Sequence, residues 1–210
     1  KALQITGTGL STKSMLKATK QAVRVAKKAG SAVIIDIDYR PVLWGLTERG
    51  DGESRFVASA SVTRVLQPFL SDLDLIIGTE EELMITGGSE SLKTAMAKIR
   101  KVSDATVVLK RGEKGCEVYV AGRDSPILSR PFPIKVLNIL GAGDAFASGF
   151  LRGWLRGETL KTCALWGNAN GALTVTRHGC CPSMASFPEL QHLIEHFDRD
   201  PNILESPELL

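Results

Sequence analysis

The stretch Asn138-Ile-Leu-Gly-Ala-Gly-Asp144 leads directly into the helical pattern Ala145-Phe-Ala-Ser-Gly-Phe150. Glycines at a helix start leave backbone N–H groups without intrahelical partners, and the helix dipole adds partial positive charge, so this turn favours an anion such as phosphate. Asp144 falls in the first helical turn, where its carboxylate is placed to accept a proton from an attacking hydroxyl. For these residues alone, a plain glycine-rich turn with a dipole-favourable acid is an equal alternative.

Upstream of this turn, short apolar runs alternate with helical patterns. Strands are expected at 2–6, 32–37, 73–77 and 106–109, and helices at 11–28 (with Ser11 as its N-cap), 53–69, 80–86 and 91–101. This alternation is typical of βαβ units and predicts an α/β fold with a mostly parallel central sheet. Turn residues within 117–136 predict an antiparallel edge there, followed by helices at about 141–156 and 159–176.

Composition narrows the functional class. The 26 basic and 23 acidic residues give a net charge of +3 without a long basic block, so no nucleic-acid-binding stripe is expected. Four cysteines at 116, 163, 180 and 181 make a poor disulfide framework, which indicates a reducing cytoplasm. No apolar run approaches the ~20 residues that span a bilayer, so no membrane partner is expected. Small molecules are the expected partners.

The two ends of the chain differ from its middle. A strand-like run opens the sequence with no element before it, which predicts a domain truncated at its N-terminus. Residues 1–197 are expected to form one nucleotide-binding and catalytic portion. The acidic stretch 198–210 carries two prolines and is expected to be a tail or linker outside the core.

The run Gly-Ala-Gly-Asp-Ala-Phe-x-x-Gly-Phe at 141–150 resembles the C-terminal signature of the PfkB, or ribokinase-like, sugar kinases. Three further segments resemble that family in the same order: Thr79-Glu-Glu-Glu82, Val107-Val-Leu-Lys-Arg-Gly-Glu-Lys-Gly115 and Asn168-Ala-Asn-Gly-Ala-Leu-Thr-Val-Thr-Arg-His-Gly179. The resemblance implies a three-layer ribokinase-like domain that lacks the family's N-terminal sugar-binding and lid portion.

The resemblance also implies roles for individual residues. Asp144 would be the catalytic base and contact the sugar, and the backbone of Gly141, Ala142 and Gly143 would stabilise the moving phosphoryl group. Thr79, Glu82, Lys110, Gly112, Gly115 and Asn168 would bind the nucleotide. The implied cofactors are ATP and Mg²⁺, with Glu82 holding Mg²⁺ through water. Thr79 replaces the family's usual Asn, and first-turn acids of an ordinary helix remain the alternative for 79–82.

Many relatives also hold a monovalent cation, for which K⁺ is the candidate here. The matching positions are Asn138, Leu140, Thr174, Arg177, Gly179 and Ser183. Asn138 stands where the family commonly has Asp, and losing that formal charge from an oxygen-ligand site predicts weaker cation binding.

The substrate is indicated by Asp36-Ile-Asp-Tyr-Arg-Pro-Val-Leu-Trp44, which resembles a stretch in family members that act on keto-deoxy sugar acids. Arg40 would pair with a substrate or phosphate oxygen, and a surface ion pair is the alternative. Kinases for fructose, ribose or another keto-deoxy sugar acid also stay open. The resemblance further suggests a homodimer and an aldolase-like domain fused after residue 210.

Other patterns point to different classes of protein. Gly7-Thr-Gly-Leu-Ser-Thr12 partly matches a dinucleotide fingerprint but lacks the third glycine, so an NAD-dependent oxidoreductase is a weaker hypothesis. His192-Leu-Ile-Glu-His196 matches an inverted zinc-protease motif, and a polar helix face is the favoured interpretation. A non-catalytic nucleotide-binding module is the remaining alternative.

Overall fold

The computed structural model describes residues 1–48, 57–200, 202–207 and 209. Its strands are β1 (Ala2–Thr6), β2 (Ala32–Asp36), β3 (Leu75–Thr79), β4 (Thr106–Lys110), β5 (Cys116–Tyr119) and β6 (Ile127–Ser129), and the strand order in the sheet is β1-β2-β3-β4-β5-β6. Its α-helices are α1 (Lys13–Lys28), α2 (Ala60–Leu66), α3 (Glu80–Gly87), α4 (Leu92–Arg100), α5 (Ala142–Trp154), α6 (Leu160–Val175) and α7 (Phe187–His196). The predicted α/β class with a mostly parallel sheet is confirmed, because β1 to β4 all pair in parallel.

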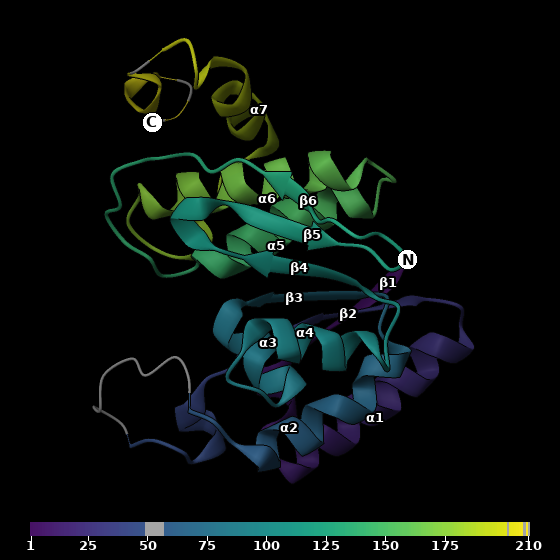
Figure 1. Cartoon of the computed structure of the whole chain (residues 1–210). Coiled ribbons are helices and arrows are strands. Elements are labelled where there is room, and N and C mark those ends of the chain that lie inside the picture. Colours follow the sequence, from purple (N-terminus) through teal and green to yellow (C-terminus); the bar gives the residue numbers. More distant parts are fainter. Residues whose placement is uncertain (49–56, 201, 208, 210) are drawn as a thin grey trace. The chain divides into compact units, whose positions relative to one another are not determined.

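Residues 1–110 and 118–126 form a first compact unit. Its four parallel strands are nearly continuous apolar runs, and in β3 three successive side chains, Leu75 to Ile77, are fully buried. Helices α1 to α4 lie on one face of these strands (Figure 1). The carboxyl ends of the strands therefore lie at a common edge, where ligands of open α/β sheets bind.

Two helix starts in this unit differ from the prediction. The N-cap of helix α1 is Thr12, one residue later than the expected Ser11. The Thr12 hydroxyl accepts the capping hydrogen bond from the Met15 amide (3.3 Å). The helix expected at 53–69 is shorter, since Ser59 caps α2 and Pro68 falls in a following 3₁₀ helix. Residues 53–56 of that prediction lie outside the described residues.

Residues 111–117 and 127–210 form a second compact unit. Helices α5 and α6 pack closely through glycines on their facing sides. A side chain at Gly149 would place its Cβ 2.5 Å from the backbone oxygen of Trp166, so the two helix backbones are nearly in contact. The core of this unit includes Phe132, Leu173 and Leu193.

Two apolar residues in the described part of the stretch 198–210 are buried. Ile203 and Leu209 are only 3% and 4% exposed and belong to the core of the second unit. The carbonyl of Leu209 also accepts a hydrogen bond from the Arg177 guanidinium (2.8 Å). These two side chains therefore pack in a core that includes residues of α6 and α7, and the assignment of 198–210 as a tail or linker stays a prediction.

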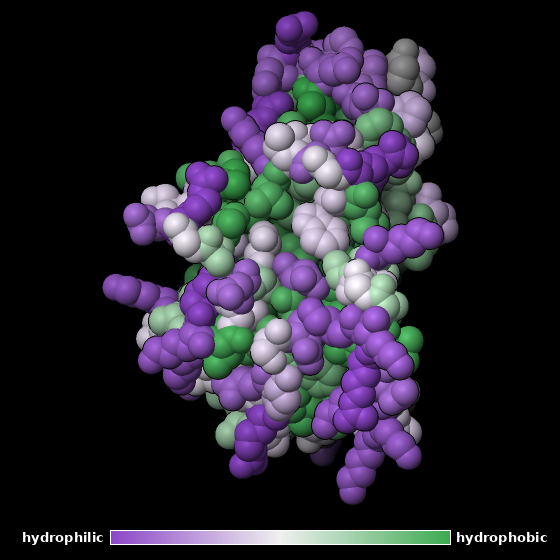
Figure 2. Space-filling model, turned by 90° about the vertical axis from the view of Figure 1, so that its right-hand side faces the viewer, coloured by the Kyte–Doolittle hydropathy of each residue, from purple (hydrophilic) through white to green (hydrophobic). Residues whose placement is uncertain are grey.

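Figure 2 shows one face of the molecule, on which long hydrophilic side chains project and hydrophobic side chains are visible between them. Within the described part of the chain, no helix has both the length and the apolar character needed to cross a bilayer.

Candidate functional site

The glycine turn before α5 forms as the sequence predicts. Gly141 is the N-cap, with a left-handed backbone (φ 86°), and its carbonyl accepts the first helical hydrogen bond from the Ala145 amide (2.9 Å). A Cβ on Gly141 would lie 2.6 Å from the Cys180 sulfur, so glycine is required for both its conformation and its contact. Asp144 is exposed in the first turn, beside N–H groups that favour an anion.

Asn138 links the approach to α5 with the loop that follows α6. Its side-chain amide donates to the Gly179 carbonyl (2.9 Å), and its side-chain oxygen accepts from the Leu140 amide (3.1 Å). The backbone amides of Leu137 and Asn138 both donate to the Val175 carbonyl. A neutral amide donor thus occupies one of the carbonyl oxygens that the family resemblance assigns to a monovalent cation.

The other predicted cation positions also have protein partners. Thr174 is fully buried and its hydroxyl donates to the Asn170 carbonyl (2.8 Å). The Arg177 guanidinium donates to the Ser183 carbonyl (3.4 Å), and the Ser183 hydroxyl donates to the Cys180 carbonyl (2.6 Å). The loop is therefore held by hydrogen bonds within the protein.

Three predicted nucleotide positions lie around the turn after β4 and on α6. Gly112 and Gly115 both have positive φ values, and the Gly115 amide donates to the Gly112 carbonyl (3.0 Å). A Cβ on Gly115 would lie 2.3 Å from the Ser129 carbonyl oxygen. The Asn168 amide nitrogen donates to the Ser129 hydroxyl (3.2 Å) and the Arg130 carbonyl (2.9 Å). Gly115 and Asn168 thus meet at Ser129, a buried residue that the sequence interpretation missed.

The first unit holds a separate cluster of buried charges. The Lys110 ammonium lies 3.1 Å from an Asp36 carboxylate oxygen and 3.8 Å from a Glu82 carboxylate oxygen, and all three side chains are 6–13% exposed. Burial raises the pKa of Asp36 to about 6, against the opposing charge of Lys110. Burial alone would lower the pKa of Lys110, but the charges of Asp36 and Glu82 outweigh it and raise that pKa.

Glu82 also closes a capping box at the start of α3. One of its carboxylate oxygens accepts from the Thr79 amide (2.7 Å), while the Thr79 hydroxyl accepts from the Glu82 amide (3.4 Å). Its other oxygen accepts from the Tyr39 amide (3.1 Å). The alternative given for 79–82, an acidic first helical turn, therefore describes the local structure, and the role in binding Mg²⁺ stays a prediction.

Arg40 follows directly on this cluster, in the turn after β2. Its Nε donates to the Asp38 carboxylate (2.8 Å), and its side chain is 58% exposed. Asp38 has a left-handed backbone (φ 37°), uncommon for a residue with a side chain. The turn therefore combines an exposed guanidinium with local backbone strain. Strained backbone of this kind often occurs at binding sites.

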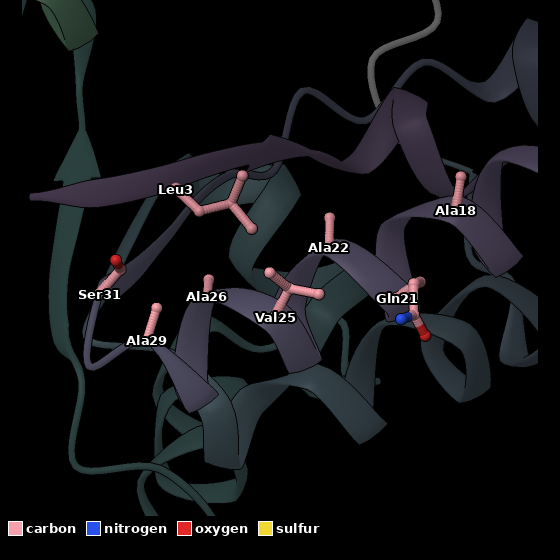
Figure 3. A pocket seen from close by; sticks show the side chains of 8 residues that line it. All are labelled: Leu3, Ala18, Gln21, Ala22, Val25, Ala26, Ala29 and Ser31. Atoms are coloured by element: carbon pink, nitrogen blue, oxygen red, sulfur yellow. The ribbon is translucent and has the colours of Figure 1, made fainter.

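A groove of about 600 Å³ lies elsewhere in the first unit, along α1 and the edge strand β1. Figure 3 shows its lining of small and apolar side chains, among them Leu3, Ala22, Val25 and Ala26. None of its lining residues is titratable. This groove offers no group that could take part in acid–base chemistry, so the candidate site is placed at the carboxyl edge of the strands and at the start of α5.

The predicted site residues fall into both compact units. Arg40, Thr79, Glu82 and Lys110 belong to the first, where Glu82 and Lys110 meet at the Asp36 carboxylate. The positions from Gly112 onward belong to the second. That the two groups act on one ligand stays a prediction.

A mostly parallel α/β sheet and a glycine-capped helix start that carries an acid are features typical of α/β proteins that bind phosphate groups. Residues 1–186 match the family described as pfkB family carbohydrate kinase, so the chain belongs to that family.

Similar curated proteins are the 5-dehydro-2-deoxygluconokinases of Bacillus licheniformis and Shouchella clausii, each 31% identical over 92–93% of this chain and 56% of the relative. Among solved structures, a putative ribokinase II from E. coli has a TM-score of 0.77 at 23% identity, covering 92% of this chain and 58% of that one. A fructokinase from Vibrio cholerae has a TM-score of 0.75 at 22% identity, covering 90% and 59%. The chain spans a little over half the length of these relatives.

Proposed function

We propose that this chain carries the catalytic part of a kinase that transfers the γ-phosphoryl group of ATP to a hydroxyl of a keto-deoxy sugar acid, with 5-dehydro-2-deoxygluconate as the sugar. One observation carries the proposal: Asp144 lies in the first turn of α5, three residues after the glycine N-cap Gly141. The names of the curated relatives support the choice of sugar.

In this mechanism the Asp144 carboxylate accepts the proton of the sugar hydroxyl as its oxygen bonds to the γ-phosphorus. The bond from the γ-phosphorus to the bridging oxygen breaks, and ADP leaves with the electron pair. The N–H groups at Gly141 and Gly143 are proposed to stabilise the negative charge on the transferring group, while the Ala142 amide between them donates to the Ile139 carbonyl (3.3 Å). A base and an anion-binding backbone are thus supplied by one helical turn.

The nucleotide and Mg²⁺ are assigned to residues of both units. Gly112, Gly115 and Asn168 are proposed to seat the nucleotide together with Thr79 and Lys110. The oxygen donors of Asp36 and Glu82 suit Mg²⁺, which would neutralise phosphate charge. Both carboxylates already accept hydrogen bonds within the protein, so contact through water fits them better than direct ligation.

We expect K⁺ to bind weakly and to have little effect on activity. Asn138 presents an N–H donor to the Gly179 carbonyl, whereas a cation site needs oxygen ligands facing one another. The amide therefore competes with a bound cation for that carbonyl.

This chain alone is expected to turn over little or no sugar, because it lacks the family's sugar-binding and lid portion. The test is therefore phosphoryl transfer from ATP by the full-length parent protein and by its Asp144→Asn variant, with Asp124→Asn as a matched exposed control. The sugars are 5-dehydro-2-deoxygluconate, 2-keto-3-deoxygluconate, fructose and ribose. We expect the first sugar to be preferred and kcat to fall about 10²-fold or more only in Asp144→Asn. Equal kcat in the wild type and that variant would remove Asp144 as the base.

The choice of sugar is tested separately through Arg40. Arg40→Lys keeps the charge but loses bidentate pairing, so KM should rise about tenfold for the two sugar acids and stay unchanged for fructose. A preference for fructose or ribose would keep the kinase and reject the sugar acid.

A non-catalytic nucleotide-binding module is the second candidate. It is favoured by the buried Asp36–Lys110–Glu82 cluster, whose charges are paired with one another. ATP binding by calorimetry that survives Asp144→Asn, with no phosphoryl transfer to any of the four sugars, would support this alternative.

A further inference from the structure

Asn170, on α6, is a buried amide whose hydrogen bonds are all made within the second unit. It is 5% exposed. Its side-chain nitrogen donates to the Ala145 carbonyl (2.8 Å) and to the Ser148 hydroxyl (2.8 Å), and its side-chain oxygen accepts from the Ala185 amide (3.2 Å). The Ser148 hydroxyl in turn donates to the Ala145 carbonyl (2.9 Å). One side chain therefore connects three segments of the chain.

These contacts lie beside the proposed catalytic turn. Ala145 follows Asp144 directly, so a bond to its carbonyl restrains rotation of α5 about its axis at the level of the base. Gly149, one turn further along α5, lies against the Asn170 Cβ and the Trp166 backbone, which restrains the distance between the helices. Small residues alone would allow α5 and α6 to slide along each other. The hydrogen bonds of the Asn170 side-chain amide are directional and oppose that movement.

The third contact reaches the loop that touches the glycine cap. The loop 180–185 ends at Ala185, whose amide donates to Asn170. At the other end of this loop, the Cys180 carbonyl accepts from the Ser183 hydroxyl, and the Cys180 sulfur lies against Gly141. Asn170 thus touches both α5 and the loop that packs on its N-cap.

We propose that Asn170 is a positioning residue, which holds the first turn of α5 and the loop 180–185 in register so that Asp144 and the Gly141 N-cap keep one geometry. The inference rests on the proposed role of Asp144. A purely structural role would predict lost stability with unchanged turnover per folded molecule.

Asn170→Asp separates these possibilities. Its carboxylate cannot donate to the Ala145 carbonyl, but the protonated acid can, and burial raises the pKa of such a group. We expect kcat at about pH 8 to fall tenfold or more with KM for ATP nearly unchanged, and to recover as the pH falls toward about 6. Asn202→Asp, an exposed change of the same kind in the same unit, should follow the wild-type pH profile.

A readout that does not depend on activity distinguishes this inference from failure of the proposed function. In Asn170→Asp, the amide resonances of residues 142–146 should shift with pH as the new acid titrates, while those in Asn202→Asp should not. Wild-type kcat at every pH, or pH-independent resonances in that turn, would overturn the proposal even if Asp144 proves to be the base.

Ser148→Ala provides a second variant if Asn170→Asp does not fold. It removes the hydroxyl partner but keeps the bond from Asn170 to Ala145, so kcat should fall a few-fold with KM for ATP unchanged. An unchanged kcat, with an unchanged resonance for the Ala145 amide, would count against the positioning role.

Discussion

At the scale of single residues, Asp36 makes the stability of the fold depend on pH. Burial raises the pKa of its folded-state carboxyl to about 6 from 3.8, so the folded protein holds this proton more tightly than the unfolded chain does. Its contribution to stability is therefore fully present below about pH 4 and is lost as the pH rises through about 6. The free energy of unfolding of the wild type, measured against Asp36→Asn, should fall by up to about 3 kcal/mol over that range.

Urea unfolding at a series of pH values measures this difference directly. Asp74→Asn is the control for the loss of one carboxylate in the same unit outside the Asp36–Lys110–Glu82 cluster; the Asp74 side chain lies near Lys27 and accepts a hydrogen bond from the Val33 amide (2.7 Å). If the difference in free energy of unfolding between wild type and Asp36→Asn stays constant from about pH 4 to 7, the pKa of Asp36 is not raised in the folded protein.

Gly141 is a second case in which one residue determines local geometry. Gly141→Ala puts a side chain on a residue with φ 86° and drives its Cβ into Cys180. Gly157→Ala carries similar strain (φ 77°) but meets nothing within 4 Å, so it reports the backbone cost alone. We expect Gly157→Ala to cost about 1 kcal/mol and Gly141→Ala at least twice as much, by thermal unfolding. Equal losses of stability in the two variants would show that Cys180 moves aside at little cost.

At the scale of elements, the pairing of α5 and α6 depends on which glycines face the partner backbone. A Cβ at Gly149 would lie 2.5 Å from the Trp166 carbonyl oxygen, and backbone cannot move aside cheaply, whereas one at Gly171 would find its nearest neighbour at an ordinary 3.4 Å. Gly149→Ala should therefore destabilise by about 1–3 kcal/mol. Gly171→Ala should be neutral or stabilise by up to about 1 kcal/mol, because alanine favours the helix. Denaturant unfolding of both variants tests the contrast, and similar free energies of unfolding would contradict it.

Local signals explain why most elements were predictable. The glycine cap and Asp144 identified the start of α5, and apolar runs identified the parallel strands. The prediction failed where the outcome depends on distant partners. Lys110 and Asp36 are 74 residues apart in sequence, so their ion pair follows only from the register of β2, β3 and β4. Ile203 sits in an acidic, proline-containing stretch whose composition gives no sign of the apolar surface that buries it.

The amide of Asn170 shows the same limit within the candidate site. Along the sequence it lies two residues after Asn168, inside an apolar helix, and nothing in that pattern shows which amide faces α5. Only the packing of the two helices places Asn170 against the Ala145 carbonyl, while Asn168 turns to Ser129 and Arg130.

At the scale of the whole molecule, the hydrogen bond from Asn138 to Gly179 predicts how the stability of the chain responds to monovalent salt. A ligand that binds only the folded state raises the melting temperature, so a bound K⁺ would make the Tm higher in KCl than in choline chloride at equal ionic strength. We expect the same Tm for the wild type in about 0.1 M of either salt. Asn138→Asp replaces the N–H donor with a carboxylate facing a carbonyl, so it should lower the Tm in choline chloride and recover part of the loss in KCl. Asn202→Asp should show no such salt specificity. A wild-type Tm that rises specifically with K⁺ would show that the loop binds a cation despite Asn138, and an Asn138→Asp variant indifferent to K⁺ would show that this amide is not what excludes one.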